Sequence, residues 1–194
     1  MARTKEFDPE AALQAALELF WRRGYEATSM ADLVEHLGIG RASLYATFGN
    51  KHELYLKAMD RYLRTRDPQM TEELSQPGPA LPAVRTLVRR FAAEAGSEDT
   101  RLTGCFITNS AAELSPRDDT VARRVELSWE QIETLLHASL VRARAQGELP
   151  VDRDPRALAR MLLVLMQGIR LVGKASTDPA RVRDAAEQAL ALLD

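Results

Sequence analysis

The segment LGIGRASLYATFG, residues 37–49, constrains the fold more than any other part of the chain. Glycines on both sides confine a helix here to about eight residues, which is too short to be stable alone in water because helix nucleation is costly. The sequence therefore predicts a short helix that neighbouring helices hold in place.

The apolar residues of this segment share one side of the predicted helix. Leu44 and Phe48 are one turn apart and face the same way, so the outer surface carries Arg41, Ser43, Tyr45 and Thr47. The preceding turn, residues 38–40, ends one helix and begins the next, with Ile39 filling the angle between them. This pattern is a helix-turn-helix, and the DNA major groove admits one outward-facing helix of this kind.

Capping residues and apolar periodicity divide the rest of the chain into helices. Aspartate or serine followed by proline predicts helix starts at Pro9, Pro116, Pro155 and Pro179. Ser29 and Asn50 begin two more helices, each with an acidic residue in the position of a capping box. The predicted helices span 9–23, 29–37, 41–47, 51–66, 82–95, 104–113, 117–146, 155–175 and 179–193. No segment alternates as a strand does, so the predicted fold class is all-α.

Breaker residues divide the chain into two parts. Asp67 and Pro68 are expected to end the helix that begins after Asn50, and the link TEELSQPGPALP, residues 71–82, follows. We therefore predict a three-helix helix-turn-helix DNA-binding domain over 1–66, which includes a connecting helix 51–66. A helical effector-binding and dimerisation domain is predicted over 67–194, with about nine helices in all.

The stretch TSMADLVEHLGIGRASLYATFGNKHELYLKAM resembles the DNA-binding domain of the TetR/AcrR family of transcriptional repressors. The resemblance covers residues 7–57 and rests on the Thr-Ser helix start, the LGI turn, the SLY stretch, Phe48 and the Asn-Lys pair at 50–51. It implies that phosphates are contacted by Thr28, Ser29, Tyr45, Thr47 and Lys51. It also implies that base edges are contacted by Arg41, Ala42 and Ser43.

These residue types suit the implied roles. Hydroxyl groups and phenols are good phosphate ligands, and arginine reads guanine with two hydrogen bonds. Gly40 departs from the family pattern, which usually has a serine or threonine cap at this position. The alternative is an ordinary three-helix core with a solvated outer face.

Charge and composition limit the possible partners and locations. The formal net charge is −2, so any contact with nucleic acid needs a few well-placed cations rather than a basic tail. The N-terminal MARTKEFDPE has charges where a signal peptide needs an apolar stretch. The longest apolar run, MLLVLM at 161–166, is too short to span a bilayer. We expect a cytoplasmic protein that does not associate with membranes.

The sequence contains no recognisable pattern for catalysis or metal binding. The histidines fit no HExxH pattern, and there is no glycine-rich phosphate loop and no GxSxG elbow. The single cysteine excludes an internal disulfide and a multi-cysteine zinc site. We expect no enzyme, no cofactor and no metal. The alternatives are a helical enzyme whose site is assembled only in space, or an interaction module that does not bind DNA.

Two C-terminal helices predict a homodimer. The segment 155–175, PRALARMLLVLMQGIRLVGKA, is apolar on nearly all sides and must be buried on most of them. The helix 179–193 offers small side chains for close approach, and the family resemblance implies the same four-helix interface. A two-fold dimer places two reading helices on one face of DNA, so the operator should be a near-palindrome. A wholly intramolecular core is the alternative.

The C-terminal part is also expected to bind a small-molecule effector. Its candidate apolar lining is Phe91, Phe106, Trp129, Met161 and Leu165. Simple core packing of these residues is the alternative.

Cys105 suggests a more specific kind of sensing. TGCFITNSAAELS resembles the start of the sixth helix in a TetR subgroup and places this thiol in a first turn, where the helix dipole favours thiolate. Lys174 is the only lysine after Lys57 and is expected to supply a nearby cation. Together they predict an oxidant or electrophile sensor, and the alternative is an inert buried cysteine.

Overall fold

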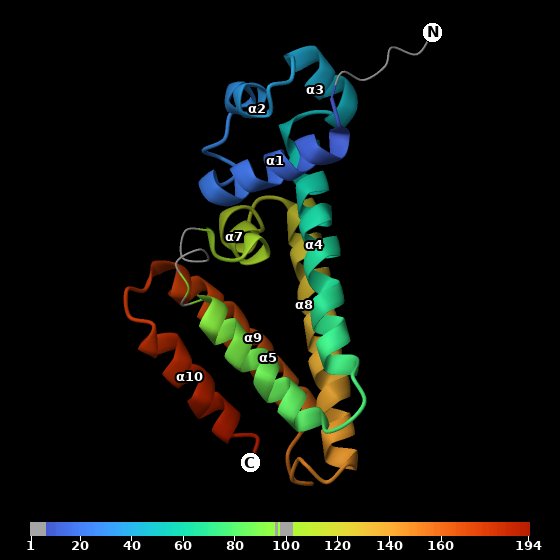
Figure 1. The fold of residues 1–194 in the computed structure, drawn as a ribbon, viewed down its shortest axis with the longest axis vertical. Helices are drawn as coiled ribbons and strands as arrows, with labels where there is room; N and C mark the ends of the chain where they lie inside the picture. The colour runs from blue at the N-terminus through green and yellow to red at the C-terminus, as the bar shows by residue number, and fades with distance from the viewer. Residues whose placement is uncertain (1–6, 96, 98–102) are drawn as a thin grey trace.

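The computed structural model describes residues 7–95, 97 and 103–194, apart from the side chains of residues 66 and 67. Over these residues the regular structure is helical and contains no strand (Figure 1), which confirms the all-α fold class. The helices are α1 (Pro9–Arg23), α2 (Met30–Leu37), α3 (Arg41–Phe48), α4 (Lys51–Ser75), α5 (Ala80–Ala95), α7 (Phe106–Glu113), α8 (Asp119–Ala145), α9 (Pro155–Ala175) and α10 (Ala180–Ala191).

Four helices begin with a side-chain cap where the sequence predicts one. Asp8 caps α1 and Asp154 caps α9, each directly before a proline at the first helical position. Ser29 and Asn50 each form a complete capping box, at the starts of α2 and α4. These caps satisfy amide groups that have no partner within the helix.

The predicted helix start at Pro116 is wrong. Helix α8 begins at Asp119, because the carboxylate of Asp118 accepts hydrogen bonds from the amides of Thr120 and Val121, at 3.0 Å each. Residues 114–117 form a turn instead, closed by a 2.8 Å bond from the amide of residue 117 to the carbonyl of residue 114.

The predicted end of the connecting helix near residue 66 is also wrong. Helix α4 continues through Pro68 to Ser75. An interior proline removes one helical hydrogen bond, but the extra turns bury Met70 and Leu74, which are 6% and 3% exposed. Burial of these side chains offsets the loss. The division of the chain at residues 66 and 67 remains a prediction, and α4 crosses it without a break.

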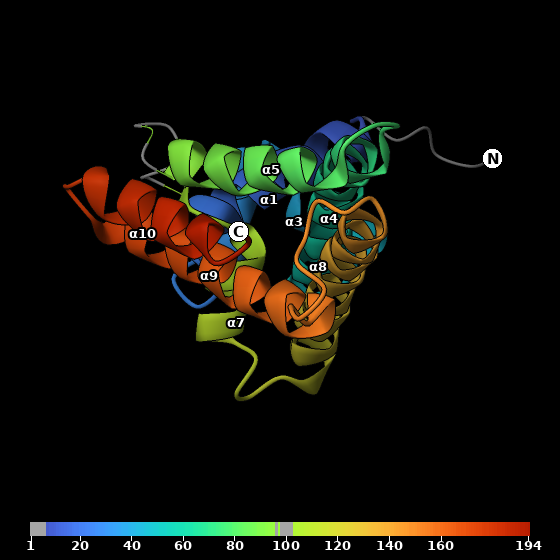
Figure 2. The same ribbon diagram turned by 90° about the horizontal axis from the view of Figure 1, so that it is seen from below.

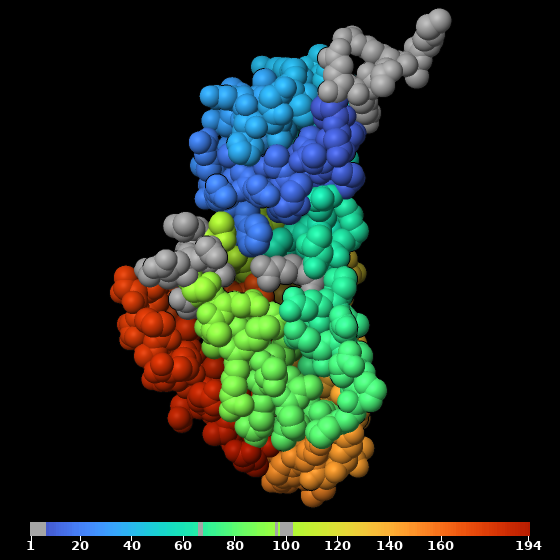
Figure 3. All heavy atoms as spheres, viewed as in Figure 1, coloured from blue at the N-terminus to red at the C-terminus, as the bar shows by residue number. Residues whose placement is uncertain are grey.

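Buried side chains form two cores. The upper core lies among α1–α3, the first half of α4, α7 and the start of α8, and the lower core lies among the end of α4, α5, the rest of α8, α9 and α10. The view from below in Figure 2 places α10 at one side of the lower core, where it contacts α5 and α9. In the space-filling view, α1 and α2 form one end of the molecule, and α5 lies with the end of α4 in the other half (Figure 3).

The long helices α4 and α8 contact each other and contribute to both cores (Figure 1). These two helices therefore connect the lower core to the three N-terminal helices. No helix in the described part of the chain combines the length and apolar character that crossing a membrane requires.

Candidate DNA-binding surface and effector cavity

The short helix α3 packs one face against the upper core. Leu44 is fully buried and Phe48 is 4% exposed, and both belong to the upper core. Ile39 in the preceding turn is 6% exposed, and Gly38 ends α2 with a positive φ of 63°. The predicted support of this helix by its neighbours is therefore confirmed.

The opposite face of α3 is open to solvent. Arg41, Ala42, Ser43 and Tyr45 are exposed, and Thr47 is partly buried. The guanidinium carbon of Arg41 lies 5.7 Å from the ring centroid of Tyr45. Gly40, the N-cap of α3, has no side chain to accept a hydrogen bond from the first-turn amides. We call Arg41, Ala42, Ser43, Tyr45 and Thr47 the reading face.

Lys51 places a positive charge in the first turn of α4, shortly after the end of α3. Lys51 follows the Asn50 cap, and its ammonium nitrogen lies 4.1 Å from the ring centroid of Tyr25. Lys57 donates a 2.9 Å hydrogen bond to the carbonyl oxygen of Phe48, at the last residue of α3. The sequence analysis missed Tyr25 and Lys57, because only the packing of α4 against the rest of the N-terminal helices brings them into these contacts.

In this structure Thr28 is not placed to contact a phosphate, and its predicted role stays a prediction. This side chain is fully buried, and its hydroxyl donates a 2.7 Å bond to the carbonyl oxygen of Gly24. Ser29 is exposed, but its hydroxyl donates to the carboxylate of Asp32 within the capping box. A phosphate contact from Ser29 requires that this hydroxyl turn away from Asp32.

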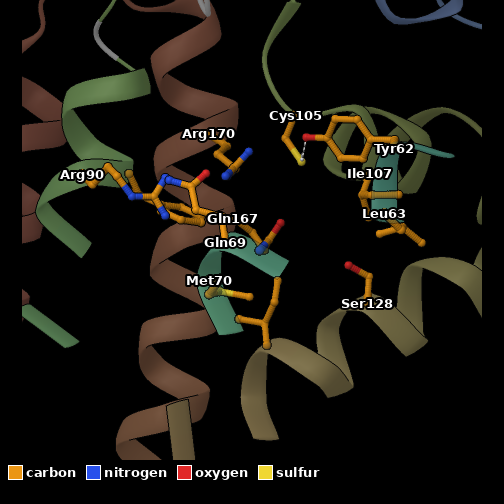
Figure 4. Close-up of a pocket in the computed structure, with 12 residues that line it drawn as sticks. Tyr62, Leu63, Gln69, Met70, Arg90, Cys105, Ile107, Ser128, Gln167 and Arg170 are labelled. Atoms are coloured by element: carbon orange, nitrogen blue, oxygen red, sulfur yellow. Dashed lines mark hydrogen bonds between the residues drawn. The ribbon is translucent and has the colours of Figure 1, made fainter. Parts of the chain in front are cut away.

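A cavity lies between the two cores. It has a volume of about 50 Å³ and is lined by residues of α4, α5, α8 and α9, together with residues at the start of α7. Figure 4 shows most of these side chains around it. The lining consists of Tyr62, Leu63, Gln69, Met70, Arg90, Phe91, Cys105, Ile107, Ser128, Ile132, Gln167 and Arg170.

The predicted effector residues are only partly assembled there. Phe91 and Cys105 line the cavity. The lining does not include Phe106, Trp129, Met161 and Leu165, whose role in effector binding stays a prediction. The two aromatic residues pack into or against the upper core, and the other two pack against the lower core. Periodicity identified their buried faces, but it does not distinguish a core residue from a cavity residue.

The cation beside Cys105 is Arg170, not Lys174. Lys174 is exposed and donates a 3.3 Å hydrogen bond to the side-chain oxygen of Asn109. The thiol of Cys105 is 7% exposed at the N-cap of α7 and accepts a 3.5 Å hydrogen bond from the hydroxyl of Tyr62. Burial raises the pKa of Cys105, but the charge of Arg170 and hydrogen bonds from Thr108 and Tyr62 outweigh it and lower the pKa below its ordinary value.

Polar contacts join the N-terminal helices to the rest of the molecule. The hydroxyl groups of Tyr55 and Ser110 lie 2.7 Å apart, between α4 and α7. The Nε2 of His52 lies 2.6 Å from a carboxylate oxygen of Asp118, at hydrogen-bond distance, between the first turn of α4 and the cap of α8. The carboxylate of Glu113 accepts hydrogen bonds from two amides in the turn after α1, at 2.8 and 3.1 Å. These bonds connect α4 and the turn after α1 to α7 and to the cap of α8.

Large apolar side chains are exposed on α9 and directly after α10. Val164, Leu171 and Val172 on α9 are 71%, 53% and 41% exposed, and Leu192 directly after α10 is 48% exposed. Exposed apolar side chains gathered on neighbouring helices are typical of a surface that another protein covers.

A helix-turn-helix with an exposed reading face, joined to a helical body, is the arrangement of a DNA-binding regulator. The model for bacterial regulatory proteins of the tetR family matches residues 12–58, and the model for the tetracyclin repressor-like C-terminal domain matches residues 80–189. The chain belongs to the TetR family of transcriptional regulators.

Relatives cover the whole chain. The uncharacterized HTH-type transcriptional regulator YezE of Bacillus subtilis is 38% identical over 195 residues, which is 100% of both chains. The HTH-type transcriptional repressor ComR of Escherichia coli is 37% identical over 87% of this chain and 80% of its own. A cysteine-substituted mutant of the TetR family regulator CifR, solved with 26-base-pair operator DNA, is 28% identical over 100% of both chains, with a TM-score of 0.86.

Proposed function

We propose that the chain is a homodimeric repressor that binds a near-palindromic operator and releases it when a small-molecule, oxidant or electrophile effector reaches the cavity. The observation that most supports DNA binding is the reading face of α3, exposed while Leu44 and Phe48 hold the helix from behind. The naming of ComR as a repressor, and the operator complex of CifR, support the same function. We infer that the chain has no enzymatic activity and acts in the cytoplasm, where bacterial operators lie.

The proposed contacts divide into two kinds. Tyr45, Thr47 and Lys51, with Ser29 after its hydroxyl turns, hold phosphates and set the register on the duplex. Arg41, Ala42 and Ser43 face base edges, and Arg41 reads guanine because its guanidinium matches the O6 and N7 acceptors. A few cations then supply the salt-dependent part of the affinity, as the net charge of −2 requires.

Fluorescence anisotropy with DNA that flanks the coding region tests these contacts. Affinity should fall steeply as salt rises, in proportion to the phosphates neutralised. Lys51→Ala should weaken binding to all sequences alike, whereas Arg41→Ala should relax preference at one base pair per half-site by roughly 1–3 kcal/mol. Arg144→Ala removes an exposed charge near the far end of α8 and is the matched control, expected to change neither. Absence of DNA binding in dilute buffer would contradict the proposal and favour a non-DNA interaction module.

The proposed dimer uses α9 and α10. Covering their exposed apolar side chains with the same helices of a second copy makes a four-helix interface with two-fold symmetry. Val164→Arg places a charge in this interface and should yield monomers in analytical ultracentrifugation. Val151→Arg is the matched control, because Val151 is 88% exposed in the turn before α9. Dimers that persist in Val164→Arg would refute this interface.

The thiol of Cys105 supports the oxidant or electrophile branch of the proposal. It lines the cavity, and its lowered pKa favours the reactive thiolate. The rate of alkylation by a maleimide, followed from pH 5 to 10, should report a thiol that titrates below about 8.5. A thiol that titrates at or above this value would leave Cys105 as an inert residue and restrict effectors to those that bind without reacting.

A further inference from the structure

Arg170 is a cation in the cavity without a carboxylate partner among the residues that the structure describes. The other arginine in the lining, Arg90, pairs with Glu73 at 2.9 Å and with Glu94 at 2.5 Å. Arg170 forms no salt bridge of this kind within the described ranges. The two arginines therefore differ in their charge balance, although both line the same small space.

The neighbours of Arg170 neutralise its charge only in part. The carbon of its guanidinium lies 4.1 Å from the ring centroid of Phe91. Burial lowers the pKa of Arg170, but the nearby Cys105 and Tyr62 side chains outweigh this effect and raise the pKa. Glu94 acts on it at longer range. A guanidinium removed from bulk water is costly unless an anion compensates it, so this position is suited to a further negative group.

The other polar lining residues favour the same kind of ligand. No acidic side chain is present in the lining as described. The side-chain oxygen of Gln167 already accepts a 2.9 Å bond from the hydroxyl of Thr108, so its amide group is left to donate into the cavity. The Nε of Arg90 is buried without a hydrogen-bond partner in the structure. Donors therefore outnumber acceptors around this cavity.

The apolar lining and the volume limit the rest of the ligand. Leu63, Met70 and Ile132 form an apolar side of the cavity, contributed by α4 and α8. A volume of about 50 Å³ holds roughly four water-sized groups, since each needs about 10–15 Å³ on this measure. A ligand that fits without rearrangement has a charged head and a short aliphatic chain.

We propose that the effector cavity binds a small aliphatic carboxylate, with its carboxylate on the guanidinium of Arg170 and its chain against Met70 and Ile132. This inference depends on the proposed function only in taking the cavity as the effector site. The amide of Gln167 donates a further hydrogen bond to the carboxylate. Figure 4 shows Gln167 and Arg170 on the same helix, with Cys105 opposite Arg170.

Isothermal titration of the full-length protein with sodium propionate tests the ligand class. Propionamide has the same shape without the charge and is the matched ligand, and sodium chloride at equal ionic strength is the salt control. We expect propionate to bind with a dissociation constant near the millimolar range, as is typical of so few atoms, and propionamide to bind at least tenfold more weakly. At ten times the dissociation constant, propionate should raise the Tm by about 3–5 °C. Equal binding of the two, or binding of neither, would overturn the proposal.

Variants of Arg170 locate the bound carboxylate. Arg170→Met should abolish the response to propionate, and Arg170→Lys should retain a weaker one, because lysine keeps the charge but not the paired donors. Arg156→Met makes the same change in the exposed first turn of α9 and should respond like the wild type. Bound propionate should also slow iodoacetamide alkylation of Cys105 several-fold, and an unchanged rate would place the ligand elsewhere and refute the assignment.

Operator binding separates this inference from the proposed function. If the wild type binds operator DNA but does not bind propionate, the proposed class of ligand is wrong. The proposed function as a DNA-binding regulator is then retained. If propionate binds at Arg170 but operator affinity does not change, the cavity holds a carboxylate that is not an effector, and the proposed release mechanism fails. We expect propionate to weaken operator binding in the wild type and to have no effect in Arg170→Met.

Discussion

The hydrogen bond between Tyr55 and Ser110 should behave asymmetrically when either partner is removed. Both side chains are buried, at 1% and 0% exposure, and their oxygens lie 2.7 Å apart. The hydroxyl of Ser110 donates to the carbonyl oxygen of Phe106 at 2.8 Å, so its only proton is already used. Tyr55 must therefore be the donor. Burial raises the pKa of Tyr55, so its hydroxyl keeps its proton at neutral pH.

The expected magnitudes follow from this assignment. Tyr55→Phe removes the bond but leaves Ser110 with its own acceptor, so we expect a loss of about 1 kcal/mol in the free energy of unfolding. Ser110→Ala leaves a buried hydroxyl donor without an acceptor, which costs about 2 kcal/mol. The double variant has neither group and should lose about 1 kcal/mol, so the two changes are coupled by about 2 kcal/mol.

Urea denaturation followed by circular dichroism measures these values. In a chain of 194 residues, a change of 1 kcal/mol corresponds to about 2–4 °C in Tm, so thermal scans should show the same order. Tyr45→Phe is the matched control, because Tyr45 is 40% exposed and the loss of its hydroxyl should leave stability within about 0.5 kcal/mol. If Tyr55→Phe costs more than Ser110→Ala, or if the two losses are additive, the donor assignment is refuted.

Further variants test the packing, the support of α3 and the junction between the two cores. Gly173→Ala places a methyl group 2.7 Å from the carbonyl oxygen of Ala95 and should lower the free energy of unfolding, measured by urea denaturation, by about 1–3 kcal/mol. Gly168→Ala is the control, because a methyl group there meets nothing within 4 Å. Equal losses in the two variants would contradict this packing. Lys57→Met removes the donor to the last carbonyl of α3 and should weaken DNA binding about threefold to tenfold, with an unchanged slope of log affinity against log salt in anisotropy titrations. A slope reduced by about one would show that Lys57 contacts a phosphate instead. Burial raises the pKa of Asp118, but hydrogen bonds from α8 amides and from an imidazole outweigh it and hold the pKa below its ordinary value. A lowered native pKa stabilises the fold at neutral pH, so Asp118→Asn should be less stable than the wild type at pH 7, and the difference should shrink as the pH falls below about 4. A difference in unfolding free energy that stays constant down to pH 2 would refute this linkage.

Local patterns were sufficient for most of the helices. Capping boxes at Ser29 and Asn50 depend on side chains three residues apart, and the packing of Leu44 and Phe48 depends on one helical turn. Both are properties of neighbours in the chain, so they can be read without knowing the tertiary structure. The same reasoning failed at Pro68, where distant packing offsets a local breaker.

The placement of the candidate functional residues could not be predicted from the sequence, for one common reason. Thr28 has the right chemistry for a phosphate contact, but the fold buries it and directs its hydroxyl to the backbone. Lys174 and Arg170 are one turn apart on α9, and only the arginine reaches the cavity. Residue type and periodicity do not say which of two cations on one helix faces Cys105.

The sequence by itself determined the all-α class, the short helix with its buried and exposed faces, and the TetR family, since each depends on patterns within a few tens of residues. Tertiary structure alone decided the cavity. Tyr62, Arg90, Cys105 and Arg170 come from distant parts of the chain and meet only because α4, α5 and α9 pack around the start of α7. Their shared environment, including the lowered pKa of Cys105, is a property of that packing and not of any one segment.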